Sequence, residues 1–314
     1  MSPTSYRTAP PRTYRYVEPS QRTSTDVIRV STFSIVACDS SARELGVAVQ
    51  SKFIAVGAVV PWLEADVGAI ATQAWANTTY GPSGLELLRR GVAPADVIAE
   101  LTRDDAHADQ RQVGVVDARG HSATYTGAKC MEWAGGVAAV NFSAQGNILA
   151  GQAVVDALAT SFTSTSGVLA DRLIAALRAA QAAGGDRRGK QSAALVIVKP
   201  KGGYAAMNDR FVDLRVDDHP DPVEELARIL ELYKLYFFKP APEDVLDIDT
   251  ALGREVVEHL KRAGALPEAA PQEFDCAAEA ALVRFMHREN LEERVREDGR
   301  IDKQSLAYLR SFGA

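Results

Sequence analysis

Amide and hydroxyl side chains gather directly after an apolar run that ends near residue 72. Gln73 follows the run, and Asn77 and Tyr80 come next, ahead of a Gly-Pro turn at 81–82. Groups of this kind can orient a polar ligand or donate hydrogen bonds to an oxyanion that develops on a carbonyl under attack. They can equally satisfy the backbone of their own loop. The pattern does not choose between these two interpretations.

Two further polar clusters are of the same kind. Asp109, Arg111 and Gln112 stand at the beginning of an apolar run, and the segment Gln-Gly-Asn at 145–147 predicts a sharp turn. Side chains and backbone N–H groups of such a turn can face a cleft. Neither cluster is specific for one chemistry by itself.

A glycine-rich charged segment, Gly-Gly-Asp-Arg-Arg-Gly at 184–189, follows a long alanine-rich run. Its glycines permit positive φ, and Asp186 and Arg187 offer charged contacts. The segment is not a P-loop, because the Walker spacing and its Lys-Ser/Thr pair are missing. Two interpretations stay open: a helix C-cap with an internal ion pair, or a clamp for an anion or a substrate carboxylate.

Residues 213–219 concentrate titratable groups around Arg215, and Asp217, Asp218 and His219 end the segment. Such a cluster can bind a hard cation, act as acid and base, or form a structural network of ion pairs. The sequence places no second ligand group beside it, so we expect no metal site. The G-x-S-x-G elbow of serine hydrolases and the H-E-x-x-H zinc motif are absent from the sequence.

The elements that must position these side chains alternate in kind along the chain. Short runs of β-branched and aromatic residues predict strands at 32–38, 45–49, 54–60, 67–72, 112–117, 122–126, 137–142, 193–198 and 211–216. Turn residues at 39–44 and 118–121 predict two hairpins, and residues 201–203 predict a third turn. Helical spacing appears at 84–90, 94–102, 151–163, 169–182 and 222–238. Strands, then paired helices, then strands again indicate sheet layers flanked by helices rather than a repeating βαβ unit.

Composition changes at both ends of this region. Residues 1–30 are rich in Pro, Ser, Thr, Tyr and Arg without periodicity, which predicts a disordered leader. Pro240 and Pro242 mark a linker, and three amphipathic helices with acidic exposed faces are expected at 243–264, 274–289 and 302–312. We therefore expect a leader at 1–30, an α/β domain at 31–238 and a small acidic helical domain at 241–314.

Bulk composition excludes several classes of function. The 314 residues are 46% hydrophobic and 24% charged, which is typical of a folded globular chain. A net charge of -6 offers no basic face for nucleic acid. Three cysteines without CxxC spacing suggest neither a disulfide framework nor a zinc knuckle, and indicate a reducing compartment. The sequence shows no apolar stretch of about 20 residues and no apolar signal region, so we expect a cytoplasmic protein without membrane contact.

A series of strings, in order and without large gaps over residues 32–232, resembles one bacterial family. The strings are TFSIVACD, ELGVAVQSKF, AVGAVVPW, GAIATQAWAN, YGPSGL, RQVGVVDARG, QGNILAG, AAGGDRRGKQSAAL and DLRVDDHPDPVEEL. They are similar to the family called domain of unknown function 1028, which is placed in the N-terminal-nucleophile (Ntn) hydrolase superfamily. The segment 241–314, with RFMHRENLEERV and GRIDKQSLAYL, resembles a peptidoglycan-binding-like domain that accompanies some members.

The resemblance implies a four-layer αββα sandwich and a catalytic group on the first residue of the mature chain. In that chemistry a Ser, Thr or Cys side chain attacks an amide carbonyl, and its own α-amine takes the proton. Thr32 occupies the nucleophile position, with Ser31 as the second candidate. The remaining candidates are assigned to substrate binding: Gln73, Asn77, Asn147, Asp186, Arg187 and Asp217. The amides among them are expected to donate to the oxyanion or substrate, and the charged groups to orient the amine or bind a carboxylate. No cofactor is implied.

An internal Thr32 has no free amine, so the chemistry requires a new N-terminus. The leader can be removed by proteolysis, or translation can begin at Val30 and leave Ser31 or Thr32 first after trimming. Autoproteolytic relatives usually carry Gly before the nucleophile, whereas Val30 and Ser31 precede Thr32 here, which disfavours self-cleavage. The alternative is that Thr32 only begins a strand in a protein without activity.

Two functions remain open at this stage. The first is an amidohydrolase that acts on a small amide or peptide-like molecule. The second is a non-catalytic binding or assembly protein that uses the sandwich as a scaffold and the acidic helical domain for a partner. In either case the exposed edges of two sheets, together with the habit of the superfamily, lead us to expect a homo-oligomer.

Overall fold

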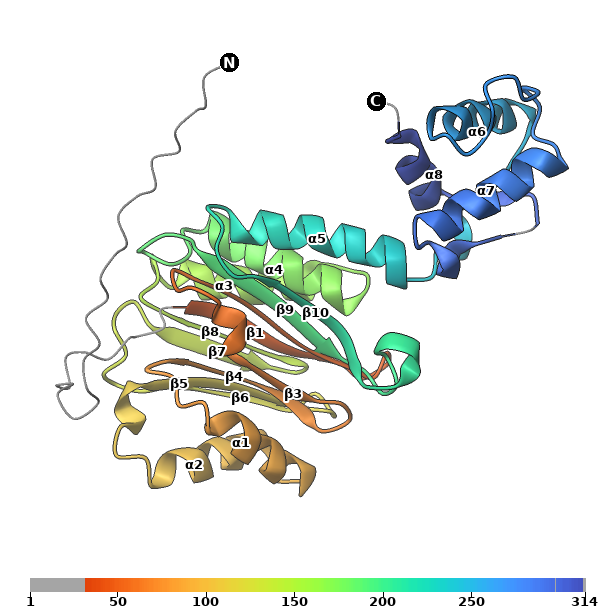
Figure 1. The fold of residues 1–314 in the computed structure, drawn as a ribbon. Coiled ribbons are helices and arrows are strands. Elements are labelled where there is room, and N and C mark those ends of the chain that lie inside the picture. Colours follow the sequence, from red (N-terminus) through yellow and green to blue (C-terminus); the bar gives the residue numbers. More distant parts are fainter. Residues whose placement is uncertain (1–31, 297, 313–314) are drawn as a thin grey trace, which may run out of the picture.

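Two antiparallel sheets lie face to face in the part of the chain before residue 217 (Figure 1). The computed structural model describes residues 32–296 and 298–312. The expected leader and Ser31 lie outside the described residues. Within them, antiparallel sheets and helices form a mixed α/β protein, as the sequence predicts.

The larger sheet has six strands, and the smaller sheet has four. Across the larger sheet the order is β10 (Arg210–Val216), β9 (Ser192–Val198), β2 (Glu44–Ser51), β1 (Thr32–Asp39), β8 (Phe142–Asn147) and β7 (Gly135–Ala139). Across the smaller sheet the order is β3 (Pro61–Glu64), β4 (Gly68–Ala74), β5 (Arg111–Asp117) and β6 (Ser122–Thr126).

Strand β1 lies inside the larger sheet and is buried on both faces. Phe33 and Ile35 pack in the cluster formed with the helices above this sheet, whereas Val36 packs between the two sheets. Because side chains alternate along a strand, Thr32 and Ser34 share the inter-sheet face with Val36. The near-continuous apolar run of β1 reflects this double burial.

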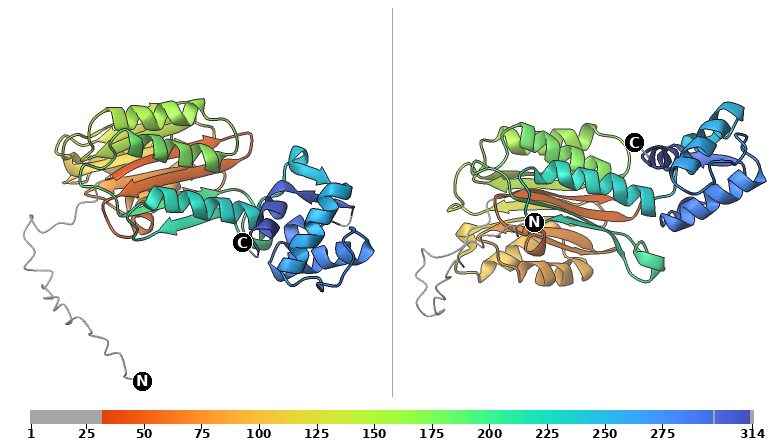
Figure 2. Two further views of the ribbon diagram at one scale, coloured as in Figure 1. Left: turned by 90° about the horizontal axis from the view of Figure 1, so that it is seen from above. Right: turned by 45° about the horizontal axis from the view of Figure 1, so that its top comes forward.

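Helices cover the outer face of each sheet (Figures 1 and 2). The larger sheet carries α3 (Ala153–Ser164), α4 (Leu169–Ala182) and α5 (Pro222–Phe237). The smaller sheet carries α1 (Tyr80–Arg89) and α2 (Pro94–Arg103). Both helical layers present a buried apolar stripe to the sheet beneath them, as amphipathic spacing requires.

The segment after α5 builds a separate core that also takes in Leu235 from the end of α5. It contains α6 (Thr250–Arg262), α7 (Cys276–Arg288), α8 (Lys303–Arg310) and the small sheet of β11 (Val245–Asp247) with β12 (Arg300–Asp302). In Figure 1 this part lies beyond the C-terminal end of α5. Among the described residues, no helix combines the length and the apolar character needed to cross a membrane.

Several local expectations were wrong. The strand expected at 54–60 does not form: these residues make turns and a 3-10 helix at Val56–Ala58, which follows Ala55 in a left-handed conformation with φ 52°. The single strand expected at 137–142 and the turn expected at 145–147 are in fact strands β7 and β8. Asn141, at φ 73°, supplies the turn between them. Asparagine tolerates this conformation better than most residues.

The helix expected at 243–264 begins later than predicted. Asp249 caps α6 by accepting hydrogen bonds from the backbone N–H groups of Ala251 and Leu252, and the residues before it pair as β11. An N-cap aspartate of this kind defines where a helix starts more strongly than apolar spacing does.

Candidate functional site

Thr32 is the first described residue of β1 and lies between the ends of two neighbouring strands. It pairs with Ser51 of β2 on one side and with Asn147 of β8 on the other. Its side chain is fully buried, and its Oγ1 donates to Ser51 Oγ at 3.4 Å. The predicted nucleophile therefore lies at the beginning of an inner strand, on the face that looks toward the smaller sheet.

Three buried amides surround this position. Gln73 Nε2 donates to the backbone oxygen of Thr32 at 3.4 Å and to Gln112 Oε1 at 2.8 Å. Asn147 Nδ2 donates to the same Gln112 Oε1 at 2.9 Å. Gln73 comes from β4, Gln112 from β5 and Asn147 from β8, so the network joins the two sheets.

The network continues along the inter-sheet face of β1 and β8. Ser34 Oγ donates to Gln73 Oε1 at 2.6 Å, and Gln145 Nε2 donates to Ser34 Oγ at 2.8 Å. Ser143 Oγ donates to Gln145 Oε1 at 2.8 Å. All these side chains are buried. A buried polar group left without a hydrogen-bond partner here would lower the stability of the fold by on the order of 1–3 kcal/mol. Each hydrogen bond of the network therefore fixes the orientation of the next side chain.

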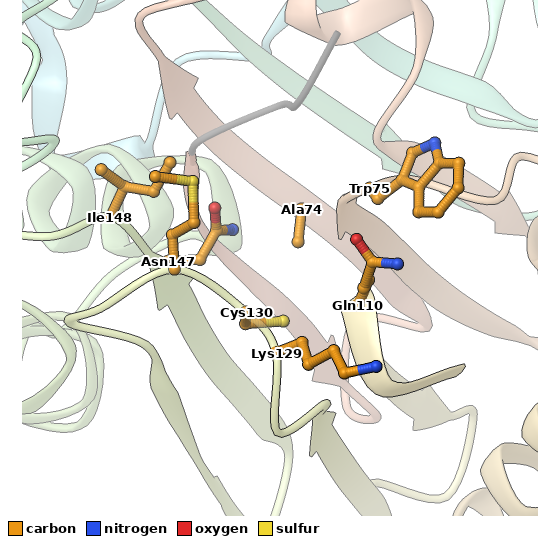
Figure 3. Close-up of a pocket in the computed structure, with 8 residues that line it drawn as sticks. Ala74, Trp75, Gln110, Lys129, Cys130, Asn147 and Ile148 are labelled. Carbon is orange, nitrogen blue, oxygen red and sulfur yellow. The ribbon is translucent and has the colours of Figure 1, made fainter. Parts of the chain in front are cut away.

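A small pocket opens at the same end of the sheets (Figure 3). Its cavity volume is about 10 Å³, and it is lined by Ala74, Trp75, Gln110, Lys129, Cys130, Met131, Asn147 and Ile148. Figure 3 shows Asn147 and Ile148 on one side of the pocket and Trp75 and Gln110 on the other. Asn147 thus belongs both to the pocket wall and to the amide network.

Two residues of the pocket wall hold unfavourable backbone conformations. Ala74 has φ 66° and Ile148 has φ 53°, each directly at the end of a strand. The left-handed region is rarely occupied by a β-branched residue such as isoleucine. Ile148 is held there from both sides, since its N–H donates to Met131 O and its carbonyl accepts from Arg187 N–H, each at 3.0 Å. Backbone strain of this kind tends to concentrate at functional sites.

A buried ion pair supports the opposite wall of the pocket. Arg111 Nε donates to Asp105 Oδ2 at 2.8 Å, and Arg111 Nη1 donates to Trp75 O at 2.5 Å. The guanidinium carbon of Arg111 lies 4.8 Å from the centre of the Trp75 ring. This contact fixes Trp75, which forms part of the pocket wall, against the end of β5.

Asp105 accepts further bonds from Tyr80 Oη at 2.8 Å and Asn77 Nδ2 at 3.3 Å. The hydrogen bond from Arg111 holds the pKa of the Asp105 carboxyl well below its usual range. Burial, together with the bond to Asp105, raises the pKa of the Tyr80 phenol. Asn77 therefore belongs to this cluster rather than to the network around Thr32.

Asp186 lies beside the ends of β2 and β8. Its carboxylate is buried and accepts from the backbone N–H of Lys52 and of Arg188, each at 2.9 Å. Its backbone bridges to Leu149, two residues after Asn147. Because Lys52 follows Ser51, the partner of Thr32, Asp186 is close to the site without touching the amide network.

The other two charged candidates are exposed. The Arg187 guanidinium donates to Leu149 O at 3.3 Å and otherwise faces outward. The Asp217 backbone oxygen accepts from Ala55 N–H at 3.0 Å, and its side chain is exposed. Of the candidates named from the sequence, Thr32, Gln73 and Asn147 come together, Asp186 and Arg187 adjoin them, and Asn77 and Asp217 do not join them.

The centre of the network, Gln112, was named in the sequence only as part of an unspecific cluster. Gln145 was named only as part of the turn expected at 145–147, and Ser34 and Ser143 were not singled out. A usable signal exists, since polar residues recur at every second position of β8 within a buried strand. The expectation of a turn at 145–147 concealed that alternation. Among the residues that the structure describes, no group of three His, Cys, Asp or Glu side chains could hold a metal ion.

Comparison with known proteins gives matches for both parts of the chain. Residues 236–309 match the family model described as "Putative peptidoglycan binding domain". No curated protein matches the chain. Protein SPO2555 from Silicibacter pomeroyi, a solved structure of the DUF1028 family, is 29% identical with a TM-score of 0.60, and the match covers 68% of this chain and 97% of that one. Residues 32–226 match the family model itself, so the chain belongs to the family of unknown function DUF1028.

Proposed function

We propose that this protein is an amide hydrolase of the N-terminal-nucleophile type, with Thr32 as nucleophile. The observation that carries the proposal is the place of Thr32. Its hydroxyl begins an inner strand, faces the second sheet, and adjoins both a buried amide network and a strained pocket.

The layer order supports the same proposal. Helices α3, α4 and α5 cover the six-stranded sheet, that sheet faces the four-stranded one, and α1 and α2 cover the far side. We propose that this arrangement is the four-layer αββα sandwich of the Ntn hydrolases. The membership in DUF1028 supports the assignment through the resemblance from which it was first inferred.

The proposed chemistry requires the peptide bond before Thr32 to be broken, which releases an α-amine. The unperturbed pKa of such an amine is about 7.7–8.0, and burial lowers it further, so the neutral form is available near neutral pH. Thr32 Oγ1 attacks the amide carbon while its proton passes to the amine. The tetrahedral intermediate expels the amine product, which takes that proton, and leaves an ester on Thr32. Water, deprotonated by the same amine, then hydrolyses the ester.

The pocket is too small for a substrate in the described structure. Its cavity volume is about 10 Å³, room for about one water molecule and far below the roughly 300–1,000 Å³ of sites that hold drug-sized ligands. We therefore propose a small amide or peptide-like substrate that binds only after this end of the sheets has opened. The proposal also requires that release of the amine opens a path from this pocket to Thr32 Oγ1, since Thr32 is fully buried in the described structure.

That same burial favours a second candidate function, a binding or assembly protein in which Thr32 is structural. In this alternative the amide network serves to fasten the two sheets together. Under either function, the family match of residues 236–309 bears on where the protein is found in the cell. The description of that family names a cell-wall polymer, which favours a location at the cell wall over the cytoplasm expected from the sequence.

The experiment compares three proteins: one whose first residue is Thr32, the same protein with Thr32→Ala, and the chain that retains Ser31. Each is treated with a small electrophile that acylates N-terminal nucleophiles, and the adduct is located by peptide mass spectrometry. We expect one adduct on Thr32 of the first protein and none on the other two. Equal labelling of all three, or no labelling of the first despite a native fold, would favour the binding protein.

A further inference from the structure

The orientation of the amide at Asn147 is determined by groups on the opposite sheet, and it has a chemical consequence. Gln112 is the residue that fixes this orientation. Its Nε2 lies 2.8 Å from Gly146 O, 3.2 Å from Gly135 O and 2.9 Å from Thr126 Oγ1. Backbone carbonyls only accept hydrogen bonds, so the side of Gln112 that faces them must be the NH₂ group.

The other side of the Gln112 amide must therefore be its oxygen. That oxygen faces Gln73 at 2.8 Å and Asn147 at 2.9 Å, and it can only accept. Both neighbours must present NH₂ groups to it. The bond from Ser34 Oγ to Gln73 Oε1 is consistent with this polarity at Gln73.

The Oδ1 atom of Asn147 consequently points away from Gln112. Asn147 pairs with Thr32 across the sheet, and both side chains lie on the inter-sheet face. The Cβ atoms of such a pair are about 4.5–5.5 Å apart. Asn147 also lines the pocket. The side of its amide that is turned toward Thr32 and the pocket is thus an acceptor.

We propose that Asn147 accepts a hydrogen bond from the α-amine of Thr32, and that Gln112 is the positioning residue that holds it in this orientation. The inference rests on the proposed function, and it changes the role expected for Asn147 from the sequence. An oxyanion needs donors, and both N–H groups of Gln73 are directed to Gln112 Oε1 and Thr32 O, while the NH₂ group of Asn147 donates to Gln112 Oε1. Asn147 instead recognises N–H, and the oxyanion must be stabilised by other groups.

The orientation can be tested on the full chain without any activity assay. The sequence contains five asparagines, so selective ¹⁵N-asparagine labelling gives five side-chain NH₂ signals. Asn147→Ser identifies the signal of Asn147, and the exposed Asn290 serves as internal reference. We expect the NH₂ protons of Asn147 to exchange with solvent on the order of 100-fold more slowly than those of Asn290.

Exchange of the Asn147 protons at the rate of Asn290 would overturn the proposal, because the NH₂ group would then face the pocket. Gln112→Met removes the acceptor at nearly constant size. We expect it to accelerate the Asn147 exchange while the other four signals keep their positions. Unchanged Asn147 exchange in a folded Gln112→Met protein would refute the positioning role of Gln112.

A second arm uses the protein whose first residue is Thr32. In the Gln112→Met background, Asn147→Asp keeps an acceptor beside the amine without setting a carboxylate against Gln112 Oε1. Acylation of Thr32 should then stay within about tenfold of the Gln112→Met protein at its optimum, with the pH profile moved upward by the new negative charge. Asn290→Asp is the control with the same change of charge. A loss of about 10²–10³ at every pH would instead identify Asn147 as an oxyanion donor. If the unsubstituted protein is not acylated, the hydrolase proposal fails, while proton exchange still decides the orientation of Asn147.

Discussion

A single buried arginine is expected to hold the C-terminal part of the chain to α5. Arg294 Nε donates to Leu235 O at 2.5 Å, and Arg294 Nη2 donates to Lys234 O at 2.8 Å and Phe238 O at 3.0 Å. These carbonyls lie in the last turn of α5 and at its C-cap, where helices leave carbonyls unpaired, and Lys234 O also accepts from the Phe238 N–H. Arg294 Nη1 also donates to Asp302 Oδ1 at 2.6 Å, and both side chains are 1% exposed.

The perturbation is Arg294→Met, which keeps the length of the side chain and removes its charge. Loss of one partner from a buried ion pair costs about 3–5 kcal/mol. Asp302 would still accept from the N–H groups of Gln304 and Ser305 and from Ser305 Oγ, which favours the lower end of that range. The buried carbonyl of Leu235 adds about 1 kcal/mol or more. We expect a loss of about 4 kcal/mol, confined to the C-terminal part.

The assay combines urea unfolding with limited proteolysis followed by mass spectrometry. Arg294→Met should become sensitive to cleavage after residue 240, while fragments that contain 32–237 stay resistant. Arg310→Met is the control, because its guanidinium is half exposed and bonded to Glu255, and exposed pairs contribute about 0–1 kcal/mol. A loss below about 1 kcal/mol in Arg294→Met, with an unchanged cleavage pattern, would refute this reasoning.

Three further predictions concern the α/β part of the chain. Asp105→Asn leaves the buried Arg111 without its carboxylate and should cost about 3 kcal/mol at pH 7. Because the folded-state pKa of Asp105 is depressed, its contribution is present above about pH 4 and is lost as the pH falls, so the two proteins should converge in urea unfolding at low pH. Gly114→Ala would bring a Cβ to 2.2 Å from Gln145 Oε1 and should lower the stability of the fold by about 1–3 kcal/mol. Gly151→Ala, whose Cβ would have nothing within 4 Å, should lower it by less than about 0.5 kcal/mol. Thermal unfolding compares the two variants, and equal losses of stability would contradict the packing argument. Burial raises the pKa of the Cys38 thiol to about 11, so alkylation at pH 8 should modify the exposed Cys276 quickly and Cys38 only after unfolding; rapid modification of native Cys38 would contradict its burial.

The sequence predicted helices and strands correctly wherever one local conformational preference was stronger than the others. The apolar run 32–38 and the turn residues after it predict the β1–β2 hairpin, and helix α4 begins and ends where its apolar spacing does. Prediction failed where a single residue redirected the backbone. Ala55 and Asn141 take positive φ, and no residue beside them in the sequence predicts that conformation.

The candidate site was predicted only in part, for a physical reason. Thr32, Gln73 and Asn147 were named, but their association depends on β4 facing β1 across two sheets and on β8 pairing with β1. Gln112 is recognisable as the centre of the network only once five nitrogen and oxygen partners from four other strands surround it. Conversely, Asn77 looked like a neighbour of Gln73 in sequence, yet the end of β4 directs it toward Asp105.

The proposed hydrolase chemistry requires Thr32 to be the N-terminal residue of the mature protein. Intact-mass analysis and N-terminal peptide mapping of protein purified from its native cells would show whether it is. We expect a mature species that begins at Thr32 and carries all of the amide-hydrolysing activity. A fully active protein in which Thr32 is still joined to Ser31 by a peptide bond would refute the proposal.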